Sequence, residues 1–201
     1  MKKYTLRQDL FIEIFGRKLF RIQAEIDIPR LGIKKGDLGG YIESEKNLNQ
    51  SSDAQVSGDA WVYGDARVSG NSLVSGNAWV YGNARVFGDA RVYGDAQVFG
   101  NAWVYDNAQV FGDAQVYGNA QVSVKMILKT KHDHINILGI RFSTTISLTG
   151  INVGCKHYTD LKDFESRYIQ EGKDNNYSDI ELKYLCVSIK NGLKLIKEMS
   201  K

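Results

Sequence analysis

The chain has 201 residues, of which 43% are hydrophobic and 24% charged, with a formal net charge of +3. This composition supports a packed core and excludes a chain that is disordered throughout. No window offers the roughly 18 apolar residues of a membrane span, and the N-terminus lacks the apolar run of a signal peptide. We therefore expect a cytoplasmic protein in which Cys155 and Cys186 remain reduced thiols rather than form a disulfide.

The charge is distributed unevenly along the chain. Residues 1–47 carry a net +3, residues 48–122 a net −4 and residues 123–201 a net +4. A nucleic-acid-binding protein concentrates its basic residues on one face. An acidic middle between two mildly basic ends makes nucleic acid an unlikely partner by composition, and nothing indicates a membrane.

The N-terminal segment, residues 1–47, is predicted to be a β cap followed by a first, irregular coil. Residues 10–28 alternate around the turn-like Phe15, Gly16, Arg17 and Lys18, a pattern that predicts a β-hairpin. Residues 36–42 (GDLGGYI) are expected to form the turn that starts the first coil. We assign a capping role to this segment because a repeat structure needs its open end covered.

Residues 48–123 are dominated by an internal repeat of six residues. From Val56 to Gln121 the chain reads VSGDAW, VYGDAR, VSGNSL, VSGNAW, VYGNAR, VFGDAR, VYGDAQ, VFGNAW, VYDNAQ, VFGDAQ and VYGNAQ, without an insertion. Position 1 is always Val, position 5 is Ala except at Ser72, and position 3 is Gly except at Asp106. Position 4 is always Asp or Asn.

The repeat predicts one short strand and one corner per hexad. Val at position 1 and Ala at position 5 share a face of an extended chain and form the inside. Gly followed by Asp or Asn is turn chemistry, because these residues tolerate left-handed backbone angles. A single hexad buries nothing alone, whereas coils stacked about 4.8 Å apart form a continuous core.

The hexads resemble those of the left-handed parallel β-helix proteins, in which an aliphatic residue is followed four places on by a small one. In that family three hexads make one triangular coil. The resemblance implies a mainly β fold, namely a left-handed parallel β-helix with an N-terminal β-hairpin cap and a small C-terminal α+β domain. It is specific for fold and weak for function.

With three hexads per coil, residues eighteen apart stack on one face and form ladders. The first face stacks Tyr63, Tyr81, Phe99 and Tyr117 at position 2, with Trp61, Trp79, Gln97 and Gln115 two residues earlier. The second face stacks Ser69, Phe87 and Tyr105, preceded by Arg67, Arg85 and Trp103. The third face stacks Ser57, Ser75, Tyr93 and Phe111. Because Val and Ala fill the inside, these rings are expected to face solvent or a partner.

The ladders leave two interpretations open, which are compatible with each other. Rings on neighbouring coils stabilise a parallel sheet by stacking. They also make a flat apolar surface of the kind that binds proteins, since Trp, Tyr and Arg dominate interface hot spots. We predict a partner-binding surface comprising Trp61, Tyr63, Arg67, Trp79, Tyr81, Arg85, Phe99, Trp103, Tyr105 and Tyr117, with either a foreign protein or further copies of the chain as partner.

Residues 124–201 lose the hexads and read as a small α+β domain, either a second cap, a dimerisation unit or a recognition unit. Strands are predicted at 125–130, 135–140, 144–149 and 151–154. A helix is predicted from Thr159 or Asp160 to about Gln170, with Gly172 as its stop. A second helix follows Ser178, which forms a capping box with Glu181. Its apolar positions are Ile180, Leu182, Leu185, Ile189, Leu193 and Ile196.

A catalytic or metal site is not the preferred interpretation of the remaining motifs. Many hexapeptide-repeat proteins are trimeric acyltransferases with a catalytic His, but here the three histidines are His132, His134 and His157, all outside the hexads. Cys155 and His157 are two apart and could form an activated thiol pair, although a buried Cys beside a surface His is favoured. The Asp and Asn rows at the corners are better explained by turn geometry than by Ca²⁺, and no cofactor motif is present.

The sequence as a whole resembles small phage and prophage proteins with a hairpin start, a GDLGGYIES-like turn, GDA or GNA hexads and an α+β tail. The resemblance implies a non-enzymatic binding protein of phage origin, and by analogy an anti-CRISPR-like inhibitor of host defence. The alternatives are an acyltransferase of the hexapeptide-repeat class and a self-assembling structural protein. A homo-oligomer, dimer or trimer, is expected in each case.

Overall fold

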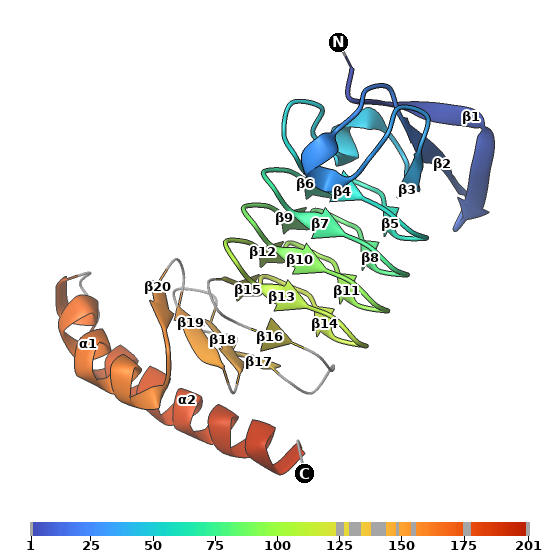
Figure 1. Ribbon diagram of the computed structural model, residues 1–201. Coiled ribbons are helices and arrows are strands. Elements are labelled where there is room, and N and C mark those ends of the chain that lie inside the picture. The colour runs from blue at the N-terminus through green and yellow to red at the C-terminus, as the bar shows by residue number, and fades with distance from the viewer. Residues whose placement is uncertain are drawn as a thin grey trace.

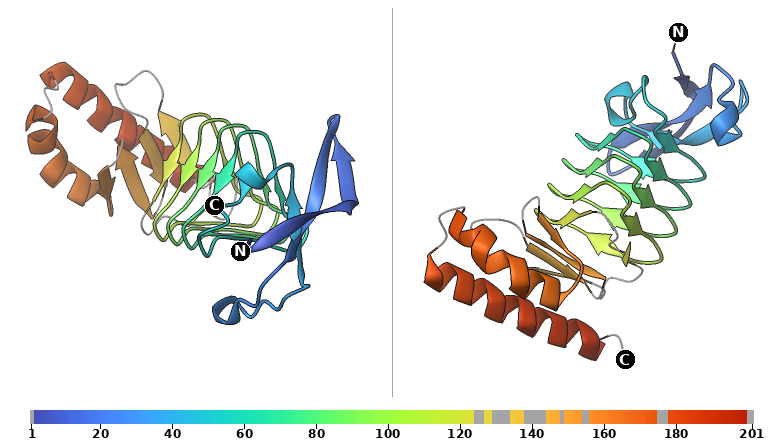
Figure 2. Two further views of the ribbon diagram at one scale, coloured as in Figure 1. Left: turned by 90° about the horizontal axis from the view of Figure 1, so that it is seen from above. Right: turned by 60° about the vertical axis from the view of Figure 1, so that its left-hand side comes forward.

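The computed structural model describes residues 2–123, 127–128, 134–137, 144–147, 149–153, 156–174 and 178–199, without the side chains of residues 127, 128, 134–137, 181 and 199. The hexads, together with the first coil before them and β16 (Ile127–Leu128) after them, form a parallel β-solenoid of about five turns (Figure 1). The N-terminal strands lie at one end of the solenoid, and the C-terminal sheet with its two helices lies at the other (Figures 1 and 2).

Each hexad contributes one two-residue strand, and the strands stack into three faces. The first face contains β3 (Leu38–Ile42), β5 (Trp61–Val62), β8 (Trp79–Val80), β11 (Gln97–Val98) and β14 (Gln115–Val116). The second face contains β6 (Arg67–Val68), β9 (Arg85–Val86), β12 (Trp103–Val104) and β15 (Gln121–Val122). The third face contains β4 (Gln55–Val56), β7 (Leu73–Val74), β10 (Arg91–Val92), β13 (Gln109–Val110) and β16 (Ile127–Leu128).

Neighbouring coils are in register at eighteen residues, as the repeat predicts. Trp61 pairs with Trp79, and Val62 with Val80, in parallel. The backbone hydrogen bonds continue around the corners, where Asp59 N donates to the carbonyl of Gly76 at 2.9 Å. Corner side chains add bonds of their own, since Asn77 Nδ2 donates to Asp95 Oδ1 at 3.0 Å. Every coil is therefore tied to the next along its strands and its turns.

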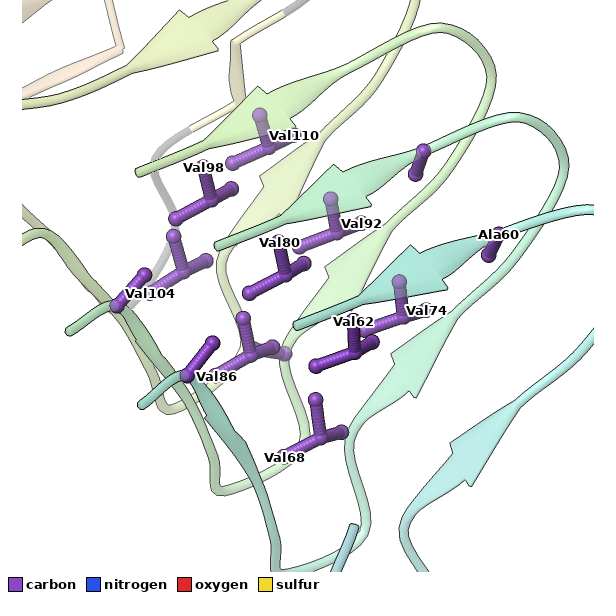
Figure 3. Close-up of a cluster of buried hydrophobic side chains, with 14 of the residues drawn as sticks. Ala60, Val62, Val68, Val74, Val80, Val86, Val92, Val98, Val104 and Val110 are labelled. Atoms are coloured by element: carbon purple, nitrogen blue, oxygen red, sulfur yellow. The ribbon is translucent and has the colours of Figure 1, made fainter. Parts of the chain in front are cut away.

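The inside of the solenoid is the predicted Val and Ala core. The Val side chains of the three faces point toward one another (Figure 3), and from Val62 to Val122 nearly every inner Val and Ala is wholly buried. Ser72 takes an Ala position, and its hydroxyl donates to the carbonyl of Ser69 at 2.7 Å. The polar side chain is thus tolerated because its hydrogen bond is made inside the turn.

The N-terminal segment pairs β1 (Tyr4–Ile14) antiparallel with β2 (Arg17–Ala24), and β2 pairs antiparallel with β3. Phe15 and Gly16 join the strands with positive φ angles of 47° and 71°, which is the backbone of a two-residue hairpin turn. β3 then pairs in parallel with β5. The predicted turn over residues 36–42 is therefore wrong beyond Asp37, because Leu38–Ile42 is a strand of the first coil.

The first coil differs from the others between Leu48 and Val56. Two short 3-10 turns precede this stretch, η1 (Pro29–Leu31) before β3 and η2 (Glu45–Asn47) after it. Leu48 then forms a parallel bridge with Val68 on the second face. Eight residues rather than six then separate the inner residues Leu48 and Val56. Lys3 fixes this longer stretch, since its Nζ donates to the carbonyls of Asn49, Ser52 and Ala54 at 2.9, 2.7 and 2.7 Å.

The C-terminal sheet contains β17 (His134–Ile137), β18 (Thr144–Ser147), β19 (Gly150–Val153) and β20 (Lys156–Tyr158), paired antiparallel in chain order. β20 was not expected from the sequence. The sheet contacts the last coil through Asn152, whose Nδ2 donates to the carbonyl of Gln121 at 2.7 Å. Thr145 Oγ1 accepts from Gln121 N at 3.2 Å. The two parts therefore share hydrogen bonds at the second face.

Helices α1 (Leu161–Asp174) and α2 (Asp179–Met199) pack on this sheet around Ile146, Ile151 and Tyr158. Asp160 caps α1, since its Oδ1 accepts from Asp163 N at 2.9 Å. The prediction that Gly172 stops the helix is wrong. Gly172 lies buried inside α1, where a Cβ would come within 2.3 Å of the Leu182 side chain, so the helix crossing rather than chain termination explains this glycine.

The apolar positions predicted on α2 are mostly correct. Leu182, Leu185, Ile189 and Ile196 are buried, and Leu193 is partly buried against them. Ile180 is 81% exposed, so its assignment to the buried face is wrong. The backbone carbonyl of Ser178 accepts from Leu182 N at 3.0 Å, whereas the Glu181 side chain of the predicted capping box lies outside the described atoms.

Candidate functional site

The ladder on the first face is a continuous stack of rings. The centroids of Tyr63 and Tyr81 lie 5.1 Å apart, those of Tyr81 and Phe99 4.9 Å, and those of Phe99 and Tyr117 5.4 Å. The first two pairs are parallel to within 3°. The backbone spacing imposes this arrangement because position 2 repeats at every coil. The rings are thus held in one orientation before any partner arrives.

Exposure increases along this ladder, from 8% at Tyr63 to 48% at Tyr117. The expectation that every ring faces solvent or a partner is therefore wrong for Tyr63. Glu43 occupies the next rung below it, and its Oε2 accepts from Gly64 N at 2.7 Å. Arg17 from β2 pairs with the Glu43 carboxylate at 2.8 Å. The burial of Tyr63 also raises its pKa. The exposed ring surface therefore lies toward the C-terminal end of the ladder.

A second ladder on the first face lies two residues earlier in each coil. Trp61 and Trp79 stack with centroids 4.7 Å apart and planes 16° apart. Tyr41 pairs with Trp61 across β3 and β5, and the guanidinium of Arg21 lies 4.7 Å from the Tyr41 ring. Sequence reasoning missed Tyr41 as a rung. The alternation Tyr41, Ile42, Glu43 matches the outer–inner–outer pattern of a hexad strand and could have indicated it.

The second face combines arginines with rings. Arg67 pairs directly with Arg85 across β6 and β9, and Arg85 pairs with Trp103 across β9 and β12. The Arg85 guanidinium lies 5.3 Å from the Trp103 ring. Phe87 meets Trp103 edge to face at 6.1 Å and stacks on Tyr105 at 5.1 Å. The structure thus brings Arg67, Arg85, Trp103 and Tyr105 together, as predicted.

A groove of about 540 Å³ runs over this part of the second face. We call it the arginine groove. Its floor is made by Arg67, Ser69, Arg85, Phe87 and Trp103, and its wall by residues 45, 46 and 48–50 of the first coil. Phe87 was not among the predicted partner-binding residues. The wall residues were also missed, because no repeat marks the first coil.

The third face carries a shorter stack. Tyr93 and Phe111 lie 4.9 Å apart with nearly parallel planes. The rungs below them are Ser57 and Ser75, so this ladder covers the C-terminal coils alone. Its outer neighbours include Arg91, which pairs with Leu73 and Gln109 across the strands. This face therefore differs from the second in having no second arginine beside the first.

The candidate catalytic residues of the C-terminal part are only partly described. His157 Nδ1 lies 2.7 Å from Asn152 Oδ1, and burial lowers the pKa of His157. Cys155, His132 and the side chain of His134 lie outside the described residues. Cys186 is a free thiol whose pKa burial raises. Among the described residues no group of three His, Cys, Asp or Glu side chains is placed to hold a metal.

Within the described part of the chain, neither helix combines the length and apolarity needed to cross a membrane.

Comparison with known proteins bears on the hexads alone. A family model described as the YdcK beta solenoid repeat matches residues 54–70, 60–76, 66–82, 78–94, 84–98 and 96–112. The matches overlap and together lie within the repeat region. No curated protein matches the chain. The family match and the stacked coils agree that the middle of this chain is a β-solenoid repeat.

Proposed function

We propose that the chain is a non-enzymatic scaffold that binds a protein partner through the first and second faces of its solenoid. The observation that carries the proposal is the ladder Tyr81, Phe99 and Tyr117, a row of stacked rings that becomes more exposed toward the C-terminal coils. Large rings fixed before binding lose little conformational freedom on association, so their apolar area contributes efficiently to affinity.

The second face supports the same function with a different chemistry. Trp103 and the arginines Arg67 and Arg85 are residue types that concentrate in interface hot spots. Trp103 is 36% exposed and borders a groove rather than a flat surface. A partner that spans both faces would therefore contact an apolar ladder on one side of a solenoid edge and a basic groove on the other.

The likeness to small phage and prophage proteins supports a more specific form of the proposal. In it, the solenoid is left-handed, the β1–β2 pair caps its first coil, and the chain is a phage-encoded, anti-CRISPR-like inhibitor that binds a host defence protein in the host cytoplasm. Self-association into a dimer or trimer through the C-terminal end of a ladder is part of the same proposal, since the Tyr117 side chain is 48% exposed.

Capture from a lysate of the bacterial host tests the proposal. The tagged chain is expected to recover a defined partner that a variant carrying Tyr81→Ser and Phe99→Ser recovers poorly. Circular dichroism shows whether the variant keeps the solenoid. A wild-type chain that recovers nothing but itself, or a folded variant that recovers the partner equally well, would contradict the proposed function.

A further inference from the structure

Arg67 and Arg85 present an unusual charge arrangement in the arginine groove. They are directly opposite each other on neighbouring parallel strands, and both are exposed. Like charges directly opposite on neighbouring strands destabilise a sheet. The chain nevertheless keeps two arginines here although the same position holds Gln or Leu elsewhere, as at Gln97 and Leu73.

No carboxylate of the described chain forms an ion pair with either arginine, although Lys46 and, more weakly, Arg67 lower the pKa of Asp65. The ion pairs join other arginines, namely Arg7, Arg17, Arg21, Arg30 and Arg167, to Asp or Glu, and neither Arg67 nor Arg85 is among them. Two nearby carboxylates are already engaged, since Asp65 pairs with Lys46 at 2.8 Å and Glu45 with Lys2 at 2.6 Å. Among the described residues, the two guanidiniums of the groove are therefore without an ion-paired carboxylate.

The surroundings hold the Arg85 guanidinium in position for a ligand. The Trp103 ring lies 5.3 Å from the Arg85 guanidinium, and Phe87 contacts the edge of Trp103. The wall opposite is fixed through Gln50, whose Oε1 accepts from Lys3 N at 2.9 Å and whose Nε2 donates to the Tyr4 carbonyl at 3.0 Å. A planar guanidinium held in this way suits a carboxylate, which it binds with two parallel hydrogen bonds.

We infer that the arginine groove binds an acidic segment of a protein partner, with carboxylates on Arg67 and Arg85 and an adjacent apolar side chain against Phe87 and Trp103. The inference rests on the proposed function in taking the partner to be a protein. The distribution of charge around the groove favours a short acidic peptide over a nucleic acid. A long phosphate chain leaving the groove would meet the corner carboxylates Asp65 and Asp89, and the repeat region as a whole is acidic.

The tryptophan side chains provide the test. The chain has three tryptophans, and only Trp103 lines the groove, while Trp61 and Trp79 stack on the first face. Substituting Trp103→Phe assigns its indole N–H signal in a nitrogen-15 spectrum. The probe is the peptide acetyl-Glu-Phe-Glu-amide, with acetyl-Gln-Phe-Gln-amide as its neutral control and a short oligothymidylate as the nucleic-acid control.

The acidic peptide is expected to shift the Trp103 signal in a saturable way and to leave Trp61 and Trp79 unchanged. Arg67→Gln and Arg85→Gln are each expected to weaken binding about tenfold, the loss of one charge-assisted contact. Arg91→Gln is the matched control, because Arg91 is also an exposed arginine on a strand but lies on the third face with Leu73 and Gln109 as neighbours. Its affinity should equal that of the wild type.

The inference is overturned if the acidic peptide leaves Trp103 unshifted at millimolar concentration, if the neutral peptide binds as well, or if Arg91→Gln weakens binding as much as Arg67→Gln. It is also overturned if oligothymidylate binds more tightly than the peptide, which would make the groove a nucleic-acid site. These outcomes are independent of the capture experiment. If the variant carrying Tyr81→Ser and Phe99→Ser loses the captured partner while the arginine variants keep it, the proposed function stands. Only the inference that the arginine groove binds an acidic segment is then contradicted.

Discussion

The glycines at the corners of the coils stack on one another, and substituting them tests how strictly each coil limits its neighbour. Gly82 and Gly118 occupy the same position of their hexads on the same corner, with φ angles of 70° and 66°. A Cβ on Gly82 would lie 3.1 Å from Gly100 N and 3.2 Å from Gly100 O, whereas a Cβ on Gly118 would meet none of the described atoms within 4 Å. The two glycines therefore share the backbone requirement and differ in that a described coil covers Gly82 alone.

The magnitudes follow from that difference. An L-residue in the left-handed region costs about 1–2 kcal/mol, and alanine recovers roughly 0.4–1 kcal/mol by restricting the unfolded chain. Gly118→Ala should thus lower the free energy of unfolding by about 1 kcal/mol. Gly82→Ala also pushes on a backbone that Asn83 N holds through a 2.8 Å hydrogen bond to the Gly100 carbonyl. Weakening that bond adds about 1–2 kcal/mol.

Urea unfolding followed by far-ultraviolet circular dichroism measures both variants against the wild type. We expect Gly82→Ala to lose about twice as much unfolding free energy as Gly118→Ala, or more, with the same dependence on urea concentration. Equal losses would refute the reasoning, because they would show that the coil beyond Gly82 imposes no steric limit. The left-handed backbone angle alone would then explain the regular spacing of glycines along the repeat.

Further predictions concern single side chains. Asp106 occupies the glycine position of its hexad with a φ angle of 54°, and this left-handed angle strains a residue other than glycine. Asp106→Gly should therefore raise the free energy of unfolding by about 1 kcal/mol in urea titrations. A lower free energy of unfolding would contradict the strain at this position. Lys3→Met leaves three carbonyls without their buried donor, namely those of Asn49, Ser52 and Ala54. It should lower the free energy of unfolding by roughly 2–3 kcal/mol in the same assay. Lys2→Met removes an exposed ion pair and should lower it by less than about 1 kcal/mol. Arg67→Gln removes one of two opposed like charges and should leave thermal stability unchanged or raise it by up to about 0.5 kcal/mol; a clear loss of stability would show that Arg67 is structural. Burial lowers the pKa of His157, so the unfolded chain takes up the proton first and stability should fall as pH drops below about 6.5; His157→Gln should flatten this part of the stability profile, and an unchanged slope would contradict the linkage.

The solenoid could be predicted in detail because its local and global patterns coincide. One rule per hexad fixes the inward Val and Ala, the corner and the outer rung, and a constant period then sets the register of every coil. Val62, Val80 and Val98 stack as the eighteen-residue spacing requires. The ladders follow from the same arithmetic, so Tyr63, Tyr81, Phe99 and Tyr117 could be placed in one row without any structure.

The errors occur where contacts join residues that no repeat relates. Tyr63 was expected to be exposed, but it lies beside Arg17 in β2 and Glu43 just after β3, both of which precede the hexads. Gly172 has the composition of a helix stop, but it lies where α1 crosses Leu182 of α2. The burial of such residues depends on how separate elements pack against one another. A single sequence contains no periodic signal for that packing.

The candidate site divides along the same line. Arg67, Arg85 and Trp103 were predicted as neighbours because they are rungs of one face. The groove they line was not predicted, because its wall is the irregular stretch around Asn49 and Gln50. That stretch is fixed by hydrogen bonds to residues 3 and 4. The repeat thus predicts which residues share a row on the surface. The groove beside that row depends on how the first coil folds, which the repeat does not indicate.

The most direct test of the central claim compares two matched tyrosines for affinity toward the captured partner. Tyr117 and Tyr93 share the second position of their hexads, and Tyr117 stacks on Phe99 as Tyr93 stacks on Phe111. Tyr117 lies on the first face and Tyr93 on the third. In biolayer interferometry, Tyr117→Ser should weaken binding about tenfold or more, and Tyr93→Ser should bind like the wild type. Equal affinities for the two variants would contradict binding through the first-face ladder.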